Sequence, residues 1–439
     1  MIFSNYKKIA TSKEKKLLLE LASSGIESLV PKSFIGKIVK LENGNLKIKD
    51  QKFNLKNKRI FVIGAGKMSG EMAFELEKII GGKKITYGFV NTNFIKNKPK
   101  KIIINKADHP LPSLKGVYGT KKILDIKKNF NLNENDVIIA LISGGGSSLL
   151  PYPIDEISFK DKKKVIIELI KSGANVYEIT IIKKKMSKVK GGKLAEYFFP
   201  SKIISLVVSD VVGNNMKIIA SGPLTKDTST FMDALNIIKK YKLQNKIPKK
   251  VLEYFIKNKS FMKEQDLSNV KQFLLASNNT LISKIENFAR KLGLKIAVIN
   301  NIQGEASLIA KHICDKLNKA KISPPLLIIY GGETTVTLKD RFGKGGRNQE
   351  FILACLKYFD HKKFKNFAIA SIASDGIDYI KESCGAIIDK DSFKEIKRYN
   401  LDKYLSKHDS YRILKKLNAN LISGLTGVNV GDIILFLFA

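Results

Sequence analysis

The sequence predicts an α/β protein of two domains: a larger Rossmann-like domain with a mostly parallel sheet, and a smaller C-terminal α/β domain. The chain has 439 residues, which exceeds the roughly 250–300 residues at which one hydrophobic core stops growing. Its hydrophobic content of 44% is typical of a folded globular protein. Apolar strands alternate with segments of helical spacing, which indicates a parallel sheet covered on both faces.

In the N-terminal half, three apolar runs each end in a turn rich in Gly, Ser or Asp. Residues 59–63 (RIFVI) lead into GAGK, and apolar residues then recur at helical spacing over 71–80. Residues 137–142 (VIIALI) lead into SGGGSS, and residues 203–209 (IISLVVS) end at Asp210. Ligands of open α/β sheets bind beyond the carboxyl ends of the strands, so we expect these turns to form one site.

A helix-rich and basic stretch at 231–263 separates these units from a strand at 273–276, which we expect to open the second domain. The polar stretch 263–269 (KEQDLSN) places the boundary near residue 265. This gives domains 1–265 and 266–439. The further strands that we expect are 294–299, 326–330, 368–373 and 433–439.

The formal net charge of +38 raises the hypothesis of a nucleic-acid-binding protein. However, the lysines are spread along the whole chain, only six of the 78 basic residues are Arg, and we find no basic stretch interleaved with aromatics. The start lacks an apolar signal segment, no run approaches the roughly 20 apolar residues of a membrane span, and the three cysteines lack metal-site spacing. We therefore expect a cytoplasmic protein without a membrane or specific nucleic-acid partner, and a homo-oligomer is compatible with the sequence.

The turn GAGKMSG carries Gly64, Gly66 and Lys67. Its GxGxxxG spacing is a weak match to a dinucleotide fingerprint, and the strand at 85–90 ends in Asn91, where a ribose-binding carboxylate is expected. It is not a P-loop either, because the first Gly and the Ser or Thr after the Lys are missing. A Lys on a Gly-rich turn that opens a helix can hold an anion, although simple packing of the glycines is the alternative.

The turn SGGGSS comprises Ser143, Gly144, Gly145, Gly146 and Ser147. Three consecutive glycines after a buried strand expose backbone N–H groups that can cradle phosphate. A plain Gly-rich turn is the alternative, and a hydrolase nucleophile is disfavoured because the final Gly of GxSxG is missing.

Four further polar positions complete the candidate set. Asp210 at a strand end suits Mg²⁺ binding or acceptance of a hydroxyl proton, with a helix cap as the alternative. Asp375 lies in a comparable acidic turn, SDGID. Arg347, followed by Asn348, stands on a Gly-rich turn before a helix, where a guanidinium can bind carboxylate or phosphate. His109 precedes a proline turn and fits a structural or a functional role equally, whereas His312, His361 and His408 show no recognisable spacing.

Taken together, these motifs and their order resemble the glycerate 2-kinase family, from about residue 15 to residue 435. The family has an N-terminal kinase domain and a C-terminal MOFRL domain. GGRNQE with the preceding GGETTVT is the most diagnostic part. The motifs that carry the resemblance are GAGKMSG, DHPLPS, ISGGGSSLL, KMSKVKGGKLA, VSDVVGNN, SGP, GGETTVTL, GKGGRNQE, SDGID and TGVNVGD.

The resemblance implies transfer of phosphate from ATP, with a divalent cation such as Mg²⁺, to the 2-hydroxyl of D-glycerate. It implies that Lys67 and Arg347 are essential, that they face each other across an active-site cleft between the domains, and that Asp210 is the acidic residue of the site. The chain departs from the family at 183–185, where KKK replaces the usual Arg-Lys-His, and at 379–382 (YIKE). The alternatives are an NAD(P)H-dependent hydroxypyruvate reductase and a nucleic-acid-binding protein.

Overall fold

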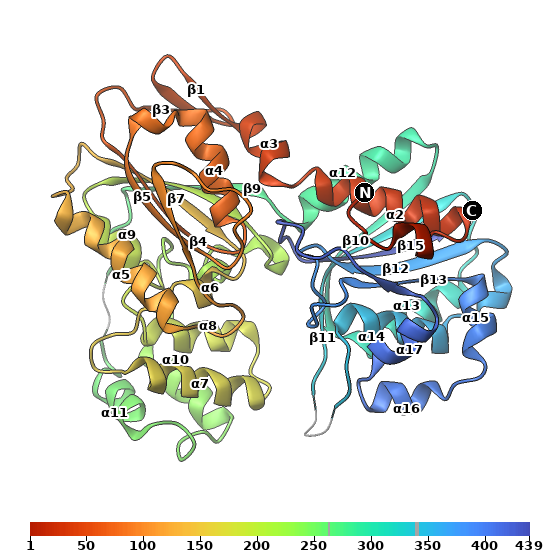
Figure 1. Cartoon of the computed structure of the whole chain (residues 1–439). Coiled ribbons are helices and arrows are strands. Elements are labelled where there is room, and N and C mark those ends of the chain that lie inside the picture. Colours follow the sequence, from red (N-terminus) through yellow and green to blue (C-terminus); the bar gives the residue numbers. More distant parts are fainter. Residues whose placement is uncertain (262–263, 339–341) are drawn as a thin grey trace. The chain divides into compact units, whose positions relative to one another are not determined.

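The computed structural model describes residues 1–261, 264–338 and 342–439, and these residues form two compact units (Figure 1). The N-terminal unit comprises residues 34–275, and the C-terminal unit comprises residues 1–33 together with 276–439. This division differs from the expected one, because the first 33 residues belong to the unit built from the end of the chain. Lys263, at the start of the polar stretch used to place the boundary, lies outside the described residues.

Helix α2 (Lys13–Glu27) explains this difference. It packs on α12 and on strands of the C-terminal sheet, and a Cβ added to Gly25 would collide with Ile285 of α12. The buried ammonium of Lys15 also lies 3.2 Å from a carboxylate oxygen of Asp389. An amphipathic helix does not specify in its own sequence which sheet it covers.

The N-terminal unit contains a six-stranded sheet of order β6-β5-β4-β7-β8-β9. Read along the chain this is the 3-2-1-4-5-6 order of doubly wound folds, and the pairs from β6 through β8 are parallel, which confirms the predicted Rossmann-like sheet. The strands are β4 (Ile60–Ala65), β5 (Ile85–Thr92), β6 (Ile102–Lys106), β7 (Val137–Ser143), β8 (Lys202–Val208) and β9 (Val270–Ala276).

Strand β9 is the edge strand beside β8, so the expectation that residues 273–276 open the second domain was wrong. Phe273 and Leu275 are buried, and just before the strand Ile203 N donates to Asn269 O at 2.8 Å. Without β9 the outer edge of β8 would present unpaired backbone groups. Sequence pattern alone does not say which sheet a short strand joins.

The helices of this unit form two groups, one that packs on the sheet and one with a hydrophobic cluster of its own. Helices α5 (Leu114–Asn129) and α9 (Lys193–Phe198) share a hydrophobic cluster with one face, and α4 (Ser69–Ile80) packs on β4, β5 and β7. A separate hydrophobic cluster joins four other helices, which lie together in Figure 1. These are α7 (Phe159–Lys171), α8 (Val176–Lys185), α10 (Phe231–Lys240) and α11 (Lys249–Lys257).

Short elements complete the N-terminal unit. An antiparallel three-stranded sheet precedes β4, and a one-turn helix follows β7. The bounds are α3 (Pro31–Ile38), β1 (Val39–Glu42), β2 (Asn45–Ile48), β3 (Gln51–Asn54) and α6 (Gly146–Leu149), with 3₁₀ turns at Gly82–Lys84, Val212–Asn214 and Ile219–Ser221.

The C-terminal unit contains a mixed six-stranded sheet of order β10-β11-β15-β12-β13-β14. Strands β10 and β11 pair in parallel. The pairs β11–β15, β15–β12, β12–β13 and β13–β14 are antiparallel. The last strand of the chain, β15, therefore lies between β11 and β12. The strands are β10 (Lys295–Glu305), β11 (Leu326–Thr335), β12 (Phe367–Ala373), β13 (Gly385–Asp389), β14 (Asn420–Leu421) and β15 (Asp432–Phe438). The helices are α1 (Tyr6–Ile9), α2, α12 (Asn278–Lys291), α13 (Ala306–Lys319), α14 (Arg347–Tyr358), α15 (Lys390–Ile396), α16 (Leu401–Ser406) and α17 (Ser410–Lys416), with a 3₁₀ turn at His361–Lys363.

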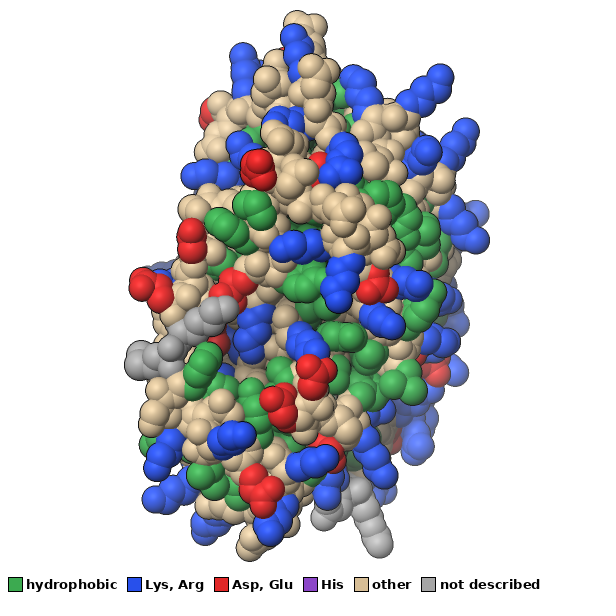
Figure 2. All heavy atoms as spheres, turned by 90° about the vertical axis from the view of Figure 1, so that its left-hand side faces the viewer, with side chains coloured by type: hydrophobic (Ala, Val, Ile, Leu, Met, Phe, Trp, Pro, Cys, Tyr) green, Lys and Arg blue, Asp and Glu red, His purple; other side chains and the backbone are tan. Residues whose placement is uncertain are grey.

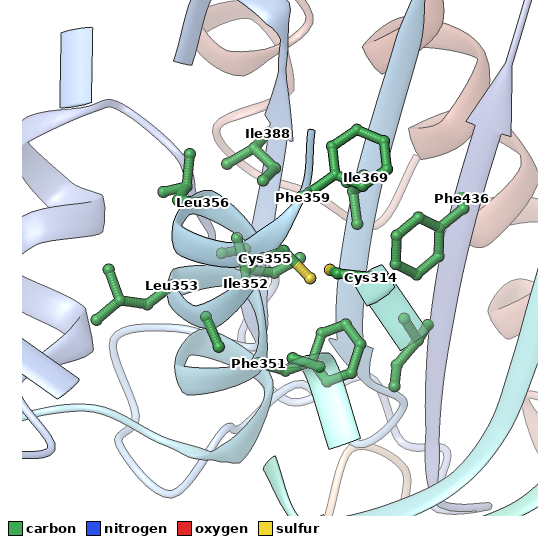
Figure 3. Close-up of a cluster of buried hydrophobic side chains, with 14 of the residues drawn as sticks. Cys314, Phe351, Ile352, Leu353, Cys355, Leu356, Phe359, Ile369, Ile388 and Phe436 are labelled. Atoms are coloured by element: carbon green, nitrogen blue, oxygen red, sulfur yellow. The ribbon is translucent and has the colours of Figure 1, made fainter. Parts of the chain in front are cut away.

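Helix α14 is anchored by the hydrophobic core of this unit (Figure 3). Phe351 and Cys355 are fully buried against a core that includes Phe436 of β15. In Figure 3 the sulfur atoms of Cys314 and Cys355 point toward each other, and both are free thiols. This packing fixes the first turn of α14, where Arg347 stands.

Charged side chains do not gather on one surface of the face drawn in Figure 2. Lys and Arg are scattered there among acidic and hydrophobic side chains, as their distribution along the sequence predicts. Among the described residues, no helix is long and apolar enough to cross a membrane.

Candidate functional site

The two Gly-rich turns of the N-terminal unit meet at the carboxyl ends of β4 and β7. These strands are neighbours, and the chain leaves them toward opposite sides of the sheet, which makes this the topological switch point. Lys67 N donates to Gly144 O at 2.8 Å, and Met68 N donates to Ser143 Oγ at 3.0 Å. The structure therefore brings the GAGK and SGGGSS turns together at one edge of the sheet.

The glycines allow these turns to approach so closely. A Cβ on Gly64 would lie 2.6 Å from Leu141 O, and one on Gly66 would collide with Ser143 Oγ. A Cβ on Gly146 would lie 2.8 Å from Ala65 O. The absence of a side chain at Gly64 and Gly66 therefore allows β4 and its turn to pack closely against β7.

Gly145 lies where three loops converge. Its φ of 78° is left-handed, and a Cβ built on it would lie 2.9 Å from His109 Cδ2 and 3.1 Å from Lys67 Cγ. His109 therefore lies beside the lysine, which the turn chemistry of its sequence left open. In the part of the chain that the structure describes, the amides of Gly145, Gly146 and Ser147 donate to no protein acceptor, so they are available to an anion.

A buried lysine that sequence reasoning missed supports the SGGGSS turn. Lys190 is 1% exposed, and its Nζ donates to Ser147 O at 2.7 Å. Burial, together with the nearby Lys162 and Lys183, holds the pKa of Lys190 well below its usual value. Ser147 is also held through its hydroxyl, whose oxygen lies 2.8 Å from that of Ser221. A run of lysines in the sequence does not reveal which one is buried.

Asp210 stands at the same edge of the sheet. It follows β8, whose last residue Val208 is paired with Ser143 of β7. Its side chain is half-buried in a turn that Ser209 Oγ stabilises by accepting from Val211 N at 3.2 Å. The structure therefore places Asp210 on the strand next to the SGGGSS turn.

Arg347 is the centre of a second group of polar residues, in the C-terminal unit. Its Nε lies 2.5 Å from Asp432 Oδ2, its Nη2 donates to Asp432 Oδ1 at 3.0 Å, and its Nη1 lies 2.8 Å from Glu333 Oε1. Burial would lower the pKa of this guanidinium, but the charges of Asp432 and Glu333 outweigh that effect and hold the pKa well above its usual value. Arg347 is thus a fixed cation.

Asp378 caps the helix that Arg347 begins. Its carboxylate accepts from the backbone N of Asn348 at 3.0 Å and of Gln349 at 2.9 Å. Burial raises the pKa of the Asp378 carboxyl, although these amides and Arg347 oppose the shift. Asp378 therefore occupies the amides at the N-terminus of this helix.

Asn348, a candidate binding residue, is 1% exposed. Its amide donates to Asp378 Oδ1 at 3.2 Å and to Asp432 Oδ2 at 3.0 Å, and its oxygen accepts from Ser371 Oγ at 2.6 Å. This geometry favours a role in positioning Asp378 and Asp432 over direct contact with a ligand.

The glycines before Arg347 make room for neighbouring segments. A Cβ on Gly343 would collide with Asp409, and one on Gly345 would collide with Ser410. The backbone of Lys344, which lies between these two glycines, is hydrogen-bonded to the same neighbouring segment. Its N donates to Asp409 Oδ1 at 2.9 Å, and its O accepts from Tyr411 N at 2.8 Å. The segment GKGGR therefore packs closely against residues 409–411, and these contacts fix the backbone conformation that leads into Arg347.

A cavity of about 300 Å³ in this unit is lined by Arg347, Glu333 and Asp378. Glu350 and His408 also line it, and His408 Nδ1 lies 2.9 Å from Glu350 Oε2. Burial raises the pKa of the Glu350 carboxyl, although His408 opposes the shift. His408 had no recognisable sequence spacing, and its partner lies 58 residues away, so its role becomes visible only in three dimensions.

Asp375 lies in the loop after β12, at the edge of the sheet where β15 begins. Its carboxylate accepts from Ile377 N at 3.0 Å, and its carbonyl oxygen accepts from Thr426 N at 3.2 Å. Gly376 approaches Gly424 so closely that a Cβ there would collide with the Gly424 carbonyl. The SDGID and TGVNVGD segments are thereby joined to each other.

No group of three or more His, Cys, Asp or Glu side chains that could hold a metal ion occurs among residues 1–261, 264–338 and 342–439.

These features define a doubly wound α/β protein with two Gly-rich turns and a lysine at the switch point of one unit and an arginine–carboxylate pocket in the other. DUF4147, described as a domain of unknown function, matches residues 17–256, and the MOFRL family matches residues 326–432. A relative from Pyrococcus horikoshii named Glycerate 2-kinase is 34% identical over 96% of both chains. A relative from Agrobacterium vitis named Putative hydroxypyruvate reductase is 33% identical over 85% of this chain and 98% of the relative.

A solved structure agrees with the first of these relatives. The crystal structure of glycerate kinase from Thermotoga maritima has a TM-score of 0.80 and 31% identity, and the match covers 97% of this chain and 99% of that one. The chain belongs to the glycerate 2-kinase family, as the motifs of its sequence indicated.

Proposed function

We propose that this protein is a glycerate 2-kinase, which transfers the γ-phosphoryl group of ATP to the 2-hydroxyl of D-glycerate. The observation that carries the proposal is the convergence of Lys67, His109 and the unused amides of Gly145–Ser147 at the switch point of the sheet. Backbone amides and a lysine in this place suit a polyphosphate. The names of the relatives supply the substrate.

In the proposed reaction, the SGGGSS turn holds the triphosphate and Lys67 neutralises charge on the phosphoryl group. The C2 oxygen of glycerate forms a bond to the γ-phosphorus while the bond to the β-phosphate oxygen breaks, and Asp210 takes the hydroxyl proton or orients the oxygen. Phosphoryl transfer needs mainly positioning and charge neutralisation, which these residues offer.

Arg347 is the second cation of the proposal. A guanidinium has five N–H donors, and the contacts with Asp432 and Glu333 use three of them. These carboxylates hold the planar group in one orientation, which suits recognition of the carboxylate of glycerate or of the transferred phosphoryl group. That Lys67 and Arg347 act on one substrate stays a prediction.

Mg²⁺ fits the donor set at Asp210. This ion is usually bound by one or two carboxylates plus substrate phosphates and keeps several waters, and Asp210 offers one half-buried carboxylate. When bound, Mg²⁺ would neutralise charge on the phosphates. We also expect the protein to act in the cytoplasm.

Incubation with D-glycerate, ATP and MgCl₂ tests the proposal. We expect phosphorus NMR to show 2-phosphoglycerate and ADP, with no product when ATP is replaced by a non-hydrolysable analogue. Failure to consume ATP in a glycerate-dependent manner would refute the assignment.

The competing function is an NAD(P)H-dependent hydroxypyruvate reductase, favoured by the Rossmann strand order and by the name of the Agrobacterium relative. Asn91 opposes it. This residue is fully buried, and its amide donates to Leu149 O at 2.7 Å, so it offers no carboxylate to a ribose. Rapid oxidation of NADH at 340 nm with hydroxypyruvate would favour the reductase.

A further inference from the structure

A large cavity that is open to solvent lies in the N-terminal unit, between its two hydrophobic clusters. Its volume is about 1250 Å³, above the roughly 300–1,000 Å³ of most small-molecule pockets. Leu124 of α5 lines it from the cluster that covers the sheet, and Phe231 of α10 lines it from the cluster of α7, α8, α10 and α11. Of the described residues, those that line it do not include Lys67 or the SGGGSS turn, so this cavity is distinct from the switch-point turns.

One part of the cavity wall is aromatic. The rings of Phe231 and Tyr254 have centroids 5.7 Å apart, and Phe261 lies 6.5 Å from Phe231. Tyr152 and Tyr197 also line the cavity and pack against the sheet cluster. Flat aromatic groups of this kind bind planar rings such as nucleotide bases.

Next to the aromatic wall stands a group of lysines, and carboxylates including Asp227 line the same cavity. Lys185 lies 5.4 Å from the centre of the Phe231 ring, and its Nζ lies 2.9 Å from Asp227 Oδ2. Asp227 also serves Lys184 at 3.4 Å, so one carboxylate neutralises two ammonium groups. Lys193 lines the same cavity.

Further lysines lie near this wall, and within the described residues none of them forms an ion pair with a carboxylate. Lys162 is 2% exposed and donates to Tyr152 O at 3.4 Å, and Lys190 is 1% exposed and donates to Ser147 O. Burial, with repulsion from neighbouring lysines, holds the pKa of both well below the usual value, and burial lowers the pKa of Lys183 to about 8. A buried cationic group without counter-ions is costly, and a bound anion would relieve this cost.

The cavity and the SGGGSS turn are linked through Lys190. Gly191, the next residue, lines the cavity, whereas the side chain of Lys190 reaches the carbonyl of Ser147. A triphosphate that rests on the turn could extend into the cavity through its α-phosphate and ribose.

We propose that this cavity binds the adenosine part of the nucleotide, with the base against the aromatic wall and the phosphates directed past Lys185 and Lys193 to the SGGGSS turn. The identity of the ligand rests on the proposed kinase function, whereas the place of binding rests on the cavity, its rings and its lysines. The cavity would thus hold the base and ribose, whereas the SGGGSS turn would hold the phosphates.

Photolabelling of the full-length protein with 8-azido-ATP tests the place of binding. We expect mass spectrometry to find the label on peptides that contain residues 152–154, 226–231 or 254–261, and we expect excess ATP to prevent the labelling. Labelling that excess ATP prevents but that lies only on segments which do not line the cavity would overturn the inference.

A variant that fills the cavity gives a second test. Thr228 is an exposed lining residue, and Thr228→Trp should raise the KM for ATP at least tenfold while it leaves the KM for glycerate within twofold. The matched control Thr11→Trp alters an exposed threonine outside the cavity and should leave both values unchanged. An unchanged KM for ATP in a folded Thr228→Trp protein would overturn the inference.

The two proposals fail in different ways. Glycerate phosphorylation by the wild-type protein, together with labelling outside the cavity, would refute the nucleotide pocket and leave the kinase function standing. ATP-protected labelling of the cavity without glycerate phosphorylation would refute the proposed acceptor and support the nucleotide pocket.

Discussion

Asp432 binds the guanidinium of Arg347 through both carboxylate oxygens, which lie 2.5 Å from Nε and 3.0 Å from Nη2. Asp432 begins β15 and is paired with Gly332 of β11 on one side and with Ala373 of β12 on the other. The arginine is therefore oriented by the central strand of the sheet. This relationship ties its chemistry to the stability of the C-terminal unit.

Replacement of Arg347 by Ala should affect both activity and stability. We expect kcat/KM to fall by a factor equivalent to about 2.7–4 kcal/mol, by analogy with loss of one preorganised donor. The free energy of unfolding should fall by about 3–5 kcal/mol, because buried Asp432 loses its partner. Arg347→Lys keeps the charge but not the planar fork and should recover only part of the activity. The control Arg290→Ala breaks an exposed pair with Glu286 and should change little. Wild-type turnover by Arg347→Ala would contradict the assignment.

Replacement of Lys67 by Ala should act on activity alone. Its side chain is half-exposed at the switch point, so we expect loss of about 2.7–4 kcal/mol of transition-state stabilisation with little change in Tm. Lys78→Ala, in an exposed pair with Glu75 on α4, is the control for loss of a lysine. If Lys67 and Arg347 act in one step, the double variant should lose less activity than the product of the single losses predicts. Fully multiplicative losses would argue for independent roles.

Gly145 and Gly173 provide a matched pair for the anion-binding turn. Both have left-handed φ values, 78° and 76°, so Ala at either position should cost about 1–2 kcal/mol of stability. A Cβ at Gly173 meets open space, whereas one at Gly145 crowds His109 and Lys67. We therefore expect Gly145→Ala to lose most of its ATP turnover and Gly173→Ala to keep it. Equal activities would show that the turn does not bind the phosphates.

Lys183→Met tests whether the buried ammonium group of Lys183 lowers the free energy of unfolding. The pKa of Lys183 is about 8 in the folded protein against 10.5 as its usual value, so the folded state binds this proton less well than the unfolded state. The penalty is complete below pH 8, decreases between pH 8 and 10.5, and is absent above. We expect urea unfolding to show that the variant is more stable than wild type at pH 7, with a smaller gain at pH 10. A gain that does not depend on pH would contradict this account.

The Glu350–His408 pair should be worth a measurable interaction energy. Glu350 is 2% exposed, and His408→Ala would leave its carboxylate without this partner, which should cost about 1–3 kcal/mol of unfolding free energy. A double-mutant cycle with Glu350→Gln should give a coupling energy of at least about 0.5 kcal/mol. Additive effects would show that the two side chains are energetically independent.

Local sequence patterns were sufficient to predict the strands and the turns that follow them, and to identify the family. An apolar run followed by glycines predicts a buried strand and a tight turn because both depend on neighbouring residues only. This is why the sequence alone places Lys67, the SGGGSS turn and Asp210 at the carboxyl edge of one sheet.

Tertiary structure alone decided which distant segments meet. Asp432 reaches Arg347 across 85 residues, His408 reaches Glu350 across 58, and Lys190 reaches Ser147 across 43. It also placed β9 in the first sheet and α2 in the C-terminal unit. The physical reason is that strand pairing and ion pairing depend on which backbone edges and buried charges lack a partner once the chain has packed, and this information does not reside in any single segment.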